Sequence, residues 1–240
     1  MDIAQFLENG HITYLPNLSI DLIIIGYKRD KLMCLLLKVD KKWMLPGGYI
    51  GIKESVNNAV IRILKERTSL EKPHFKFLSV FGNENREFKT VFKELITKSN
   101  HKWNDDFWIN KRFVTLTYYS LVHMDQITSV AGIMDEDIAW FDFEELPEIW
   151  MDHESILLKA RNHLREDLKH EQLTYNLLPK TFTMPELHHL HQTILGTSLD
   201  RSRFQKKMLA TGLFERLPKK TKKDTPGRIP YVYQIKPDTV

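Results

Sequence analysis

Hydrophobic positions in residues 1–150 alternate between the two-residue period of strands and the longer period of helices. Two β-rich runs, Ile20–Tyr27 and Leu32–Val39, flank the polar stretch 28–31, so we expect a hairpin there. Apolar residues recur at helical spacing in 53–67 and again in 85–98. Further strands are expected at Phe75–Phe81, Phe113–His123 and Ile138–Phe143. Strands interrupted by two helices predict a mixed sheet with helices packed on it, which is an α+β arrangement.

The pattern changes after residue 144. Residues 152–170 predict a charged helix with one apolar face, formed by Ile156, Leu157, Ala160 and Leu164. We interpret 151–172 as a linker helix between two domains. The first domain would then cover 1–150 and the second 173–240.

Caps and turns follow one another closely after residue 178. The capping box Thr183–Glu186 opens a helix that should end at Gly196. Asp200 is the expected N-cap of a second helix, which should end at Gly212. Two β-like segments follow, at Leu213–Leu217 and Ile229–Ile235. Helix, tight turn, helix and hairpin in this order outline a winged helix-turn-helix domain.

The second of these helices carries long hydrogen-bond donors on its predicted solvent face, opposite Phe204. Such donors suit the major groove of DNA, where base edges offer acceptors. Basic residues between the two β-like segments would meet phosphates, which adds affinity without sequence information. We therefore expect double-stranded operator DNA as a partner, contacted by Arg201, Ser202, Arg203, Gln205, Lys206, Lys207, Lys219, Lys220, Lys222, Lys223 and Arg228. A basic face that is merely solvated would explain the charges but not the order of the elements.

Charge is divided unevenly along the chain. The net charge is +4, yet residues 171–240 hold 12 lysines and arginines against 6 acidic residues, a net of +6. Residues 1–170 hold 23 against 25, a net of −2. The positive excess therefore lies in the C-terminal third, as expected for a part that contacts a polyanion.

Composition excludes several classes of protein. With 42% hydrophobic and 28% charged residues, the chain is neither collagen, nor a coiled-coil rod, nor fully disordered. No apolar run approaches the ~20 residues that span a bilayer, and the N-terminus lacks the pattern of a secretory signal. We therefore expect no membrane partner. The single cysteine, Cys34, cannot form an internal disulfide, which favours the reducing cytoplasm.

Three histidines, His188, His189 and His191, lie close together in the sequence. No cysteine or clear carboxylate completes a metal site with them. We expect them to be surface or phosphate-contacting residues, and we expect neither a metal nor another cofactor.

A second motif lies between residues 45 and 70. Following the turn Leu45–Gly48, six residues match the box of the Nudix family in register: Gly48, Glu54, Arg62, Leu64, Glu66 and Leu70. The resemblance implies a Nudix-like α/β/α sandwich with a mixed sheet. In the family, three carboxylates on one helix face bind the metal that assists diphosphate hydrolysis. Ile63 and Arg67 stand at two of these positions, so the resemblance implies the fold without enzymatic activity or catalytic residues.

The whole chain resembles the Nudix-related transcriptional regulators, in which a degenerate Nudix-like domain precedes a winged helix. Much of this likeness lies in Leu177–Pro179, Phe182–Leu187, Leu199–Arg201 and Gly227–Arg228. The resemblance implies a homodimer that binds an operator and a first domain that binds a small effector. We expect a repressor of a sugar-utilisation operon.

The effector is expected to be a monosaccharide such as L-arabinose. The metal face that would hold a diphosphate is lost, and all five tryptophans lie in 1–150, where they can stack on sugars or belong to the core. The alternative effector is ADP-ribose or a related NAD metabolite, because Arg67 can hold a phosphate. If the fold is Nudix-like, the pocket should bring together Asp21, Lys38, Trp43, Glu66 and Arg67.

Two alternatives of other classes stay open. An active Nudix hydrolase of nucleoside diphosphates, with an appended basic domain, would need metal-dependent turnover through Glu66. An RNA-associated scaffold would bind RNA as tightly as duplex DNA.

Overall fold

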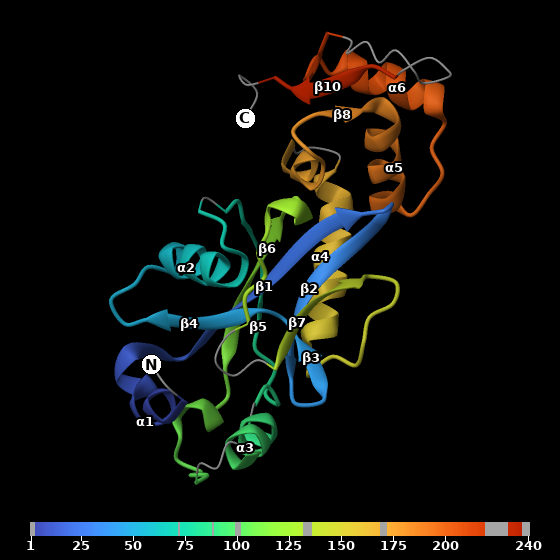
Figure 1. The fold of residues 1–240 in the computed structure, drawn as a ribbon. Helices are drawn as coiled ribbons and strands as arrows, with labels where there is room; N and C mark the ends of the chain where they lie inside the picture. The colour runs from blue at the N-terminus through green and yellow to red at the C-terminus, as the bar shows by residue number, and fades with distance from the viewer. Residues whose placement is uncertain are drawn as a thin grey trace.

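The computed structural model describes residues 3–71, 73–87, 89–98, 102–131, 136–168, 172–218 and 230–236. These residues form a seven-stranded sheet with helices, followed by a three-stranded sheet with two further helices (Figure 1). The predicted α+β arrangement with a mixed sheet is confirmed. Within the described residues, none of the helices has the length and apolar character needed to cross a membrane.

The larger sheet is built around its first strand. The strands are β1 (Tyr14–Lys28), β2 (Lys31–Val39), β3 (Lys42–Met44), β4 (Gly47–Gly51), β5 (Lys76–Phe81), β6 (Val114–Leu121) and β7 (Asp137–Asp142). Their order is β3–β2–β1–β6–β5, with β4 paired to β1 and β7 paired to β2. β1 runs parallel to β6 and antiparallel to β2 and β4. Because β1 is covered on both faces, residues 20–25 are apolar except for Asp21.

The β1–β2 hairpin forms where the sequence predicts it. Lys28 pairs with Lys31, and the two residues between them, Arg29 and Asp30, have φ angles of 51° and 60°. A two-residue turn with both φ angles positive matches the right-handed twist of the flanking strands. The tip reaches the C-terminal part of the chain, where Thr193 Oγ1 donates a hydrogen bond of 3.0 Å to the Asp30 carbonyl.

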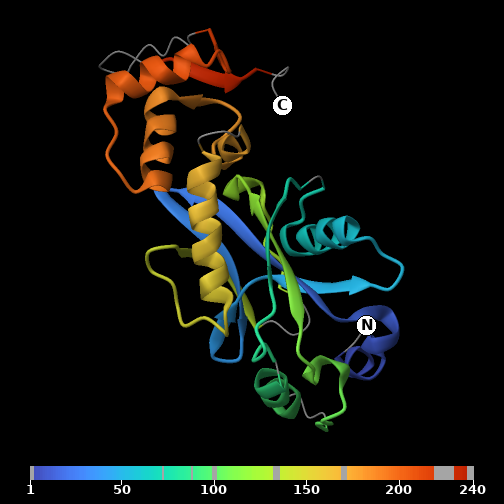
Figure 2. The same cartoon turned by 180° about the vertical axis from the view of Figure 1, so that it is seen from behind.

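Two helices cover the larger sheet on opposite faces. On β1, Ile20, Leu22 and Ile24 pack with α2 (Val56–Thr68), and Ile23 and Ile25 pack with α4 (His153–Asp167). The alternation of side chains along a strand sends neighbouring residues to opposite faces, so one strand serves both helices. In Figure 2, the view from behind, α4 lies in front of the sheet and runs toward the C-terminal part.

Shorter elements gather at the end of the sheet away from the C-terminal part (Figure 1). They are α1 (Ile3–Thr13), α3 (Lys89–Lys98) and the 3-10 turn η1 (Trp108–Asn110), while η2 (Met124–Gln126) follows β6. An aromatic cluster joins α1 and η1 to the sheet through Phe6, Tyr14, Tyr49, Trp108 and Phe113. Helix α3 corresponds to the helix predicted over 85–98, but it begins at Lys89. Phe88 lies outside the described residues.

The C-terminal elements confirm the predicted winged helix outline. They are η3 (Gln172–Leu177), β8 (Phe182–Thr183), α5 (Met184–Leu195), α6 (Arg201–Ala210), β9 (Phe214–Arg216) and β10 (Val232–Ile235). The sheet order is β8–β10–β9, and both pairings are antiparallel. The pattern did not predict β8, and β10 is shorter than the predicted strand over 229–235.

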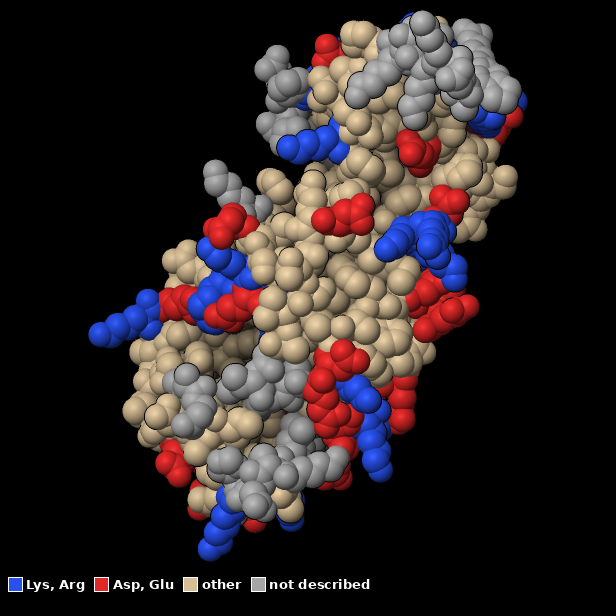
Figure 3. All heavy atoms as spheres, viewed as in Figure 1, with Lys and Arg blue, Asp and Glu red and all other residues tan. Residues whose placement is uncertain are grey.

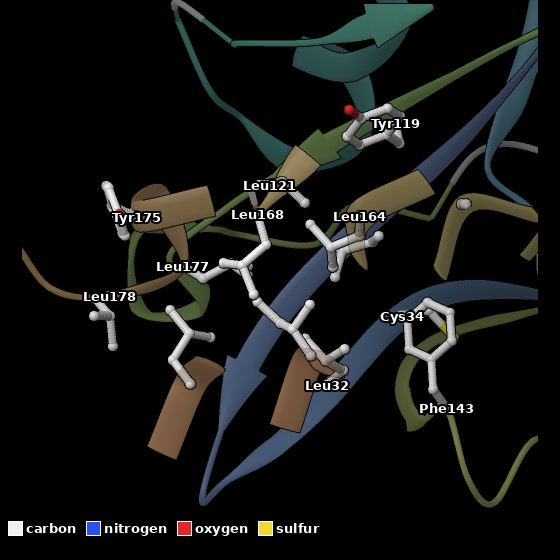
Figure 4. Packing of buried hydrophobic residues seen from close by; sticks show 14 of the residues in the cluster. Leu32, Cys34, Tyr119, Leu121, Phe143, Leu164, Leu168, Tyr175, Leu177 and Leu178 are labelled. Atoms are coloured by element: carbon white, nitrogen blue, oxygen red, sulfur yellow. The ribbon is translucent and has the colours of Figure 1, made fainter. Parts of the chain in front are cut away.

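The hydrophobic core continues from the larger sheet into the winged helix. One cluster joins Ile23 and Leu36 of the sheet to Leu164 of α4 and to Leu187 and Phe204 of the C-terminal helices. Figure 4 shows Leu164, Leu168 and Leu177 filling the space between the strands and the C-terminal helices. The helix interpreted as a linker is therefore packed along one face, and the division at 150 and 172 stays a prediction.

Candidate nucleic-acid interface and ligand site

Side-chain caps fix the geometry of the α5–turn–α6 unit. The Thr183 N–H donates to Glu186 Oε2 at 2.6 Å, and the Glu186 N–H donates to Thr183 Oγ1 at 3.4 Å, which completes the predicted capping box. α5 ends at Gly196 with φ +66°, a left-handed conformation that favours glycine. Asp200 Oδ1 accepts from the Arg203 N–H at 2.7 Å and caps α6 as predicted. These hydrogen bonds fix where α5 and α6 begin, and so they help to set the orientation of α6 relative to α5.

The predicted contact residues of α6 are all exposed, while Phe204 and Met208 are buried. The helix period separates the exposed residues into two groups. One face, directed away from Phe204, is formed by Ser202, Gln205, Lys206 and Leu209. Arg203 and Lys207 flank that face and line a cavity beside Phe204. We call the face of Ser202, Gln205, Lys206 and Leu209 the central face of α6. Hydrogen-bond donors lie on this face and beside it, as a helix in the major groove requires.

Leu209 is a member of this face that the sequence analysis missed. Its side chain is 44% exposed, although a leucine in a capped helix is more often buried. An exposed apolar side chain beside long donors suits the methyl group of thymine. The signal in the sequence was the spacing of Leu209 from Ser202, Gln205 and Lys206, which places all four on one helix face.

Strand β9 of the wing carries a cation, Arg216. The Arg216 guanidinium lies over the Tyr231 ring, with 3.3 Å between Cζ and the ring centroid. Gln234 Nε2 donates to Glu215 Oε2 at 2.9 Å across the same strand pair. Arg216 is not among the contacts predicted from the sequence. The five predicted wing contacts, Lys219, Lys220, Lys222, Lys223 and Arg228, lie outside the described residues.

The prediction of surface histidines is wrong for two of the three. His188 is buried, and its Nε2–H donates to the Leu199 carbonyl at 2.8 Å, which ties α5 to the turn. His191 is also buried, against Phe204 at 4.9 Å between ring centroids. His189 is exposed. The physical reason is the register of α5, because its apolar face includes both 188 and 191.

The helix of the Nudix box is held by an arginine and two carboxylates. Arg62 Nε donates to Glu54 Oε1 at 2.8 Å, Arg62 Nη2 to Glu54 Oε2 at 2.9 Å, and Arg62 Nη1 to Glu66 Oε1 at 3.3 Å. The hydrogen bonds from Arg62 hold the pKa of Glu54 below its ordinary value. Figure 3 shows acidic and basic side chains lying next to each other over α2. This network is a structural brace for the helix and the preceding loop.

Ile63 stands where the family has a metal-binding glutamate, and it is a core residue. Its side chain is 1% exposed and packs among Ile20, Leu22 and Ile24. The backbone of Gly48 lies so close that a Cβ there would meet Ile63 Cδ1 at 2.9 Å. Within the described residues, no group of three histidines, cysteines or carboxylates has the geometry to hold a metal ion.

Asp21 belongs to a buried cluster on the α4 side of the sheet. Arg86 Nη2 donates to Asp21 Oδ2 at 2.5 Å, and Arg86 Nε donates to both carboxylate oxygens of Asp152 at 3.2 Å. His153 lies beside them and accepts the Leu45 N–H on Nδ1 at 3.0 Å. Burial lowers the pKa of His153, so its ring is neutral. The sequence offered no signal for Arg86, because its partners are distant along the chain.

The five predicted effector residues do not meet in one pocket. Asp21 faces α4, whereas Glu66 and Arg67 lie on α2, which covers the other face of β1. Lys38 pairs with Trp43 in the β2–β3 register, and the Trp43 ring packs on Phe141 at 4.5 Å. The expectation that these five residues line one pocket is therefore wrong for Asp21 together with Glu66 and Arg67. Trp43 contributes to the core, and its role toward an effector stays a prediction.

Comparison with known proteins agrees with this two-part architecture. Residues 174–235 match the family model of the NrtR DNA-binding winged helix domain. A protein of Acinetobacter baylyi, described as an ADPR responsive transcriptional repressor, NtrR, is 24% identical over 222 residues, covering 89% of this chain and 79% of that protein.

Two solved structures share the fold over nearly the full length. NrtR from Shewanella oneidensis, crystallised with a 27mer DNA, superposes with a TM-score of 0.68 at 24% identity, covering 92% of this chain and 94% of that chain. A MutT/nudix family protein from Enterococcus faecalis has a TM-score of 0.68 at 22% identity, covering 98% and 94%. The Nudix-like domain followed by a winged helix domain, expected from the sequence, is thereby confirmed.

Proposed function

Because the chain has the architecture of the NrtR-type Nudix-related regulators and carries their winged helix domain, we propose that it is a transcriptional repressor whose Nudix-like domain responds to ADP-ribose. The observation that carries the DNA-binding part is the exposed donor face of α6, held in place by the Asp200 cap. The charge of the C-terminal part, +6 over residues 171–240, supports contact with phosphates. Homodimerisation is part of the proposal, since operators with two half-sites match a two-fold protein.

ADP-ribose replaces the sugar expected from the sequence. The Acinetobacter relative is described as ADPR responsive, and no observation on this chain favours L-arabinose over it. The tryptophan argument for a sugar weakened because Trp43 packs on Phe141 and Trp108 is buried. A diphosphate requires positive charge, which a metal supplies in the hydrolases and which cationic side chains such as Arg67 supply in this proposal.

The proposed regulator does not hydrolyse its effector. Ile63 fills one of the three carboxylate positions with a buried hydrocarbon side chain, and Arg67 brings a positive charge to another. Glu66 alone is left, and Arg62 donates hydrogen bonds to it. Mg²⁺ prefers several carboxylate oxygens and dehydrates reluctantly, so one engaged carboxylate is a poor site.

Fluorescence anisotropy on the full chain tests the proposal. A labelled duplex from the DNA beside its own gene is titrated with protein at several salt concentrations, and ADP-ribose is then added. We expect sequence-selective, salt-dependent binding that ADP-ribose reverses and L-arabinose leaves unchanged. Reversal by L-arabinose alone would restore the sugar reading. Equal affinity for RNA and duplex DNA would favour the scaffold instead.

A turnover assay separates the regulator from the hydrolase alternative. ADP-ribose is incubated with the protein and Mg²⁺, and release of AMP is followed by chromatography. We expect none above the level seen without protein. Metal-dependent release that Glu66→Gln abolishes would establish the hydrolase.

A further inference from the structure

A cavity of about 550 Å³ lies beside α6, lined also by residues of α5, by Leu168 after α4 and by Tyr175 of η3. Its apolar wall includes Tyr175, Leu195, Phe204 and Met208. This volume is within the usual range for small-molecule sites, roughly 300–1,000 Å³. The cavity belongs to the winged helix part and is separate from the Nudix box on α2.

A buried imidazole in the wall of this cavity has an unused nitrogen. His191 is 5% exposed, and its Nε2 has no hydrogen-bond partner within the described residues. Phe204 lies edge-on to the ring at 4.9 Å, and Tyr175 stacks on it at 6.2 Å between centroids, so the ring is held in place. Leaving a buried polar atom without a partner is unfavourable. A ligand that bonds to Nε2 would remove this cost.

Burial keeps His191 neutral. Burial, and then the nearby charges of Lys207 and His188, lower the pKa of His191 to about 4. At neutral pH the ring therefore carries one N–H, which a tautomer can place on Nε2. It can donate to an oxygen of a ligand without adding a buried charge of its own.

Two cations stand at the rim of the cavity. Arg203 and Lys207 are one turn apart on α6, both line the cavity, and neither forms an ion pair with a described residue. Asp200 also lines it, and its Oδ1 accepts the Arg203 N–H as the helix cap. The site therefore combines an apolar wall, one neutral donor and two cations that lack an ion-pair partner among the described residues.

From this combination we propose that the cavity binds a small amphiphilic acid, an aromatic or aliphatic body bearing one carboxylate or sulfonate. The apolar body lies against Tyr175, Phe204 and Met208, and the acid group lies between His191 Nε2 and the two cations. Because Arg203 and Lys207 also belong to the predicted DNA contacts, a bound acid neutralises part of the recognition helix. A bound acid thus weakens DNA binding directly, without any action of the Nudix-like domain. This effect on DNA binding rests on the proposed function.

The test uses 8-anilinonaphthalene-1-sulfonate, an aromatic sulfonate whose fluorescence rises in apolar surroundings. The full chain is titrated with the probe, together with the variants Arg203→Gln/Lys207→Gln and Arg201→Gln/Lys206→Gln. Both pairs remove two positive charges from α6, but only the first pair lines the cavity. We expect saturable binding at one site per chain, weakened at least tenfold by the first pair and unchanged by the second. Equal weakening by both pairs, or no saturable binding, would overturn the proposal.

His191→Phe provides a second arm, because it keeps an aromatic ring of similar size and removes the nitrogen. We expect weaker probe binding with an unchanged circular dichroism spectrum. If this variant does not fold, His191→Leu replaces it, because leucine also lacks a hydrogen-bond donor. Wild-type affinity for the probe in either folded variant contradicts the role of Nε2. Labelled duplex DNA is then displaced by the probe from wild type but not from His191→Phe. If the protein binds no DNA even without the probe, the proposed function is wrong. If it binds DNA but not the probe, only the proposal of this cavity site is wrong.

Discussion

His189 Nδ1 on α5 lies 3.3 Å from Asp30 Oδ2 at the tip of the β1–β2 hairpin. The Tyr27 hydroxyl donates to the other oxygen of the same carboxylate at 2.7 Å, and Thr193 donates to the Asp30 carbonyl. The strand hairpin of the Nudix-like part is therefore bonded to the first helix of the helix-turn-helix. Any shift of β1 relative to β2 would reach α5 through these contacts, which makes Asp30 a candidate coupling residue.

The hairpin contact predicts a pH dependence. The hydrogen bond from Tyr27, and then the contact with His189, hold the pKa of Asp30 below its ordinary value. A carboxylate with a lowered pKa contributes stability above its ordinary pKa, and this contribution is lost as pH falls through the lowered value. We therefore expect Asp30→Asn to be less stable than wild type at pH 7, and this difference to be smaller at pH 3. Urea unfolding at both pH values measures this difference.

Glu8→Gln on α1 is the control for Asp30→Asn, because it removes an exposed carboxylate far from the hairpin. A stability difference that stays constant between pH 7 and pH 3 would contradict the role of Asp30. We also expect Asp30→Asn to need more ADP-ribose for release of DNA, as measured by anisotropy. Such a change without a change in ADP-ribose affinity would place Asp30 in the coupling and not in the ligand site.

Ile63 predicts that the metal face cannot be rebuilt without loss of stability. Ile63→Glu puts a carboxyl group into the apolar layer beside Ile20 and Leu22, at a cost of about 2–4 kcal/mol in the free energy of unfolding. Ile63→Val, the control, should cost about 0.5–1.5 kcal/mol. Equilibrium unfolding in urea gives both values. A fully stable Ile63→Glu protein would show that this position reaches solvent.

The buried cluster around Arg86 predicts a large effect of one substitution. Arg86→Met leaves Asp21 and Asp152 without their guanidinium partner, and breaking such a buried pair costs about 3–5 kcal/mol. Adding Asp21→Asn should recover part of this loss, because one buried charge is then removed. Arg112→Gln, at an exposed arginine whose guanidinium donates to the Gly82 carbonyl, should change stability little. Additive effects of the two cluster substitutions would mean that Arg86 and Asp21 do not interact.

The two kinds of residue on the central face of α6 should behave differently on DNA. Lys206→Gln removes a cation, so we expect weaker binding to every duplex when it contacts a phosphate, with the salt slope reduced by about 0.9. Leu209→Ala should lower affinity by about 1 kcal/mol only for duplexes with thymine at one position. Anisotropy over a set of single-base variants measures both. Lys65→Gln, on α2, serves as the control.

Local signals predicted most of the elements and both helix caps. The box Thr183–Glu186, the Asp200 cap and the hairpin turn at 28–31 depend on residues close in sequence, so the pattern was sufficient. The burial of His188 and His191 was missed because the same histidines fit a polar or an apolar helix face. Arg86 was missed because Asp21 lies 65 positions away, and no local pattern reports such a pairing.

The core that runs from Ile23 through Leu164 to Phe204 has a calorimetric consequence. Heating cannot expose the apolar side of α5 without also exposing that of α4 and of β1. We therefore expect the Nudix-like domain and the winged helix domain to unfold in one heat-absorption peak. Ligand bound to either part then raises the melting temperature of both. A ligand bound to the Nudix-like domain would therefore also raise the melting temperature of the recognition helix, even if it causes no change of conformation.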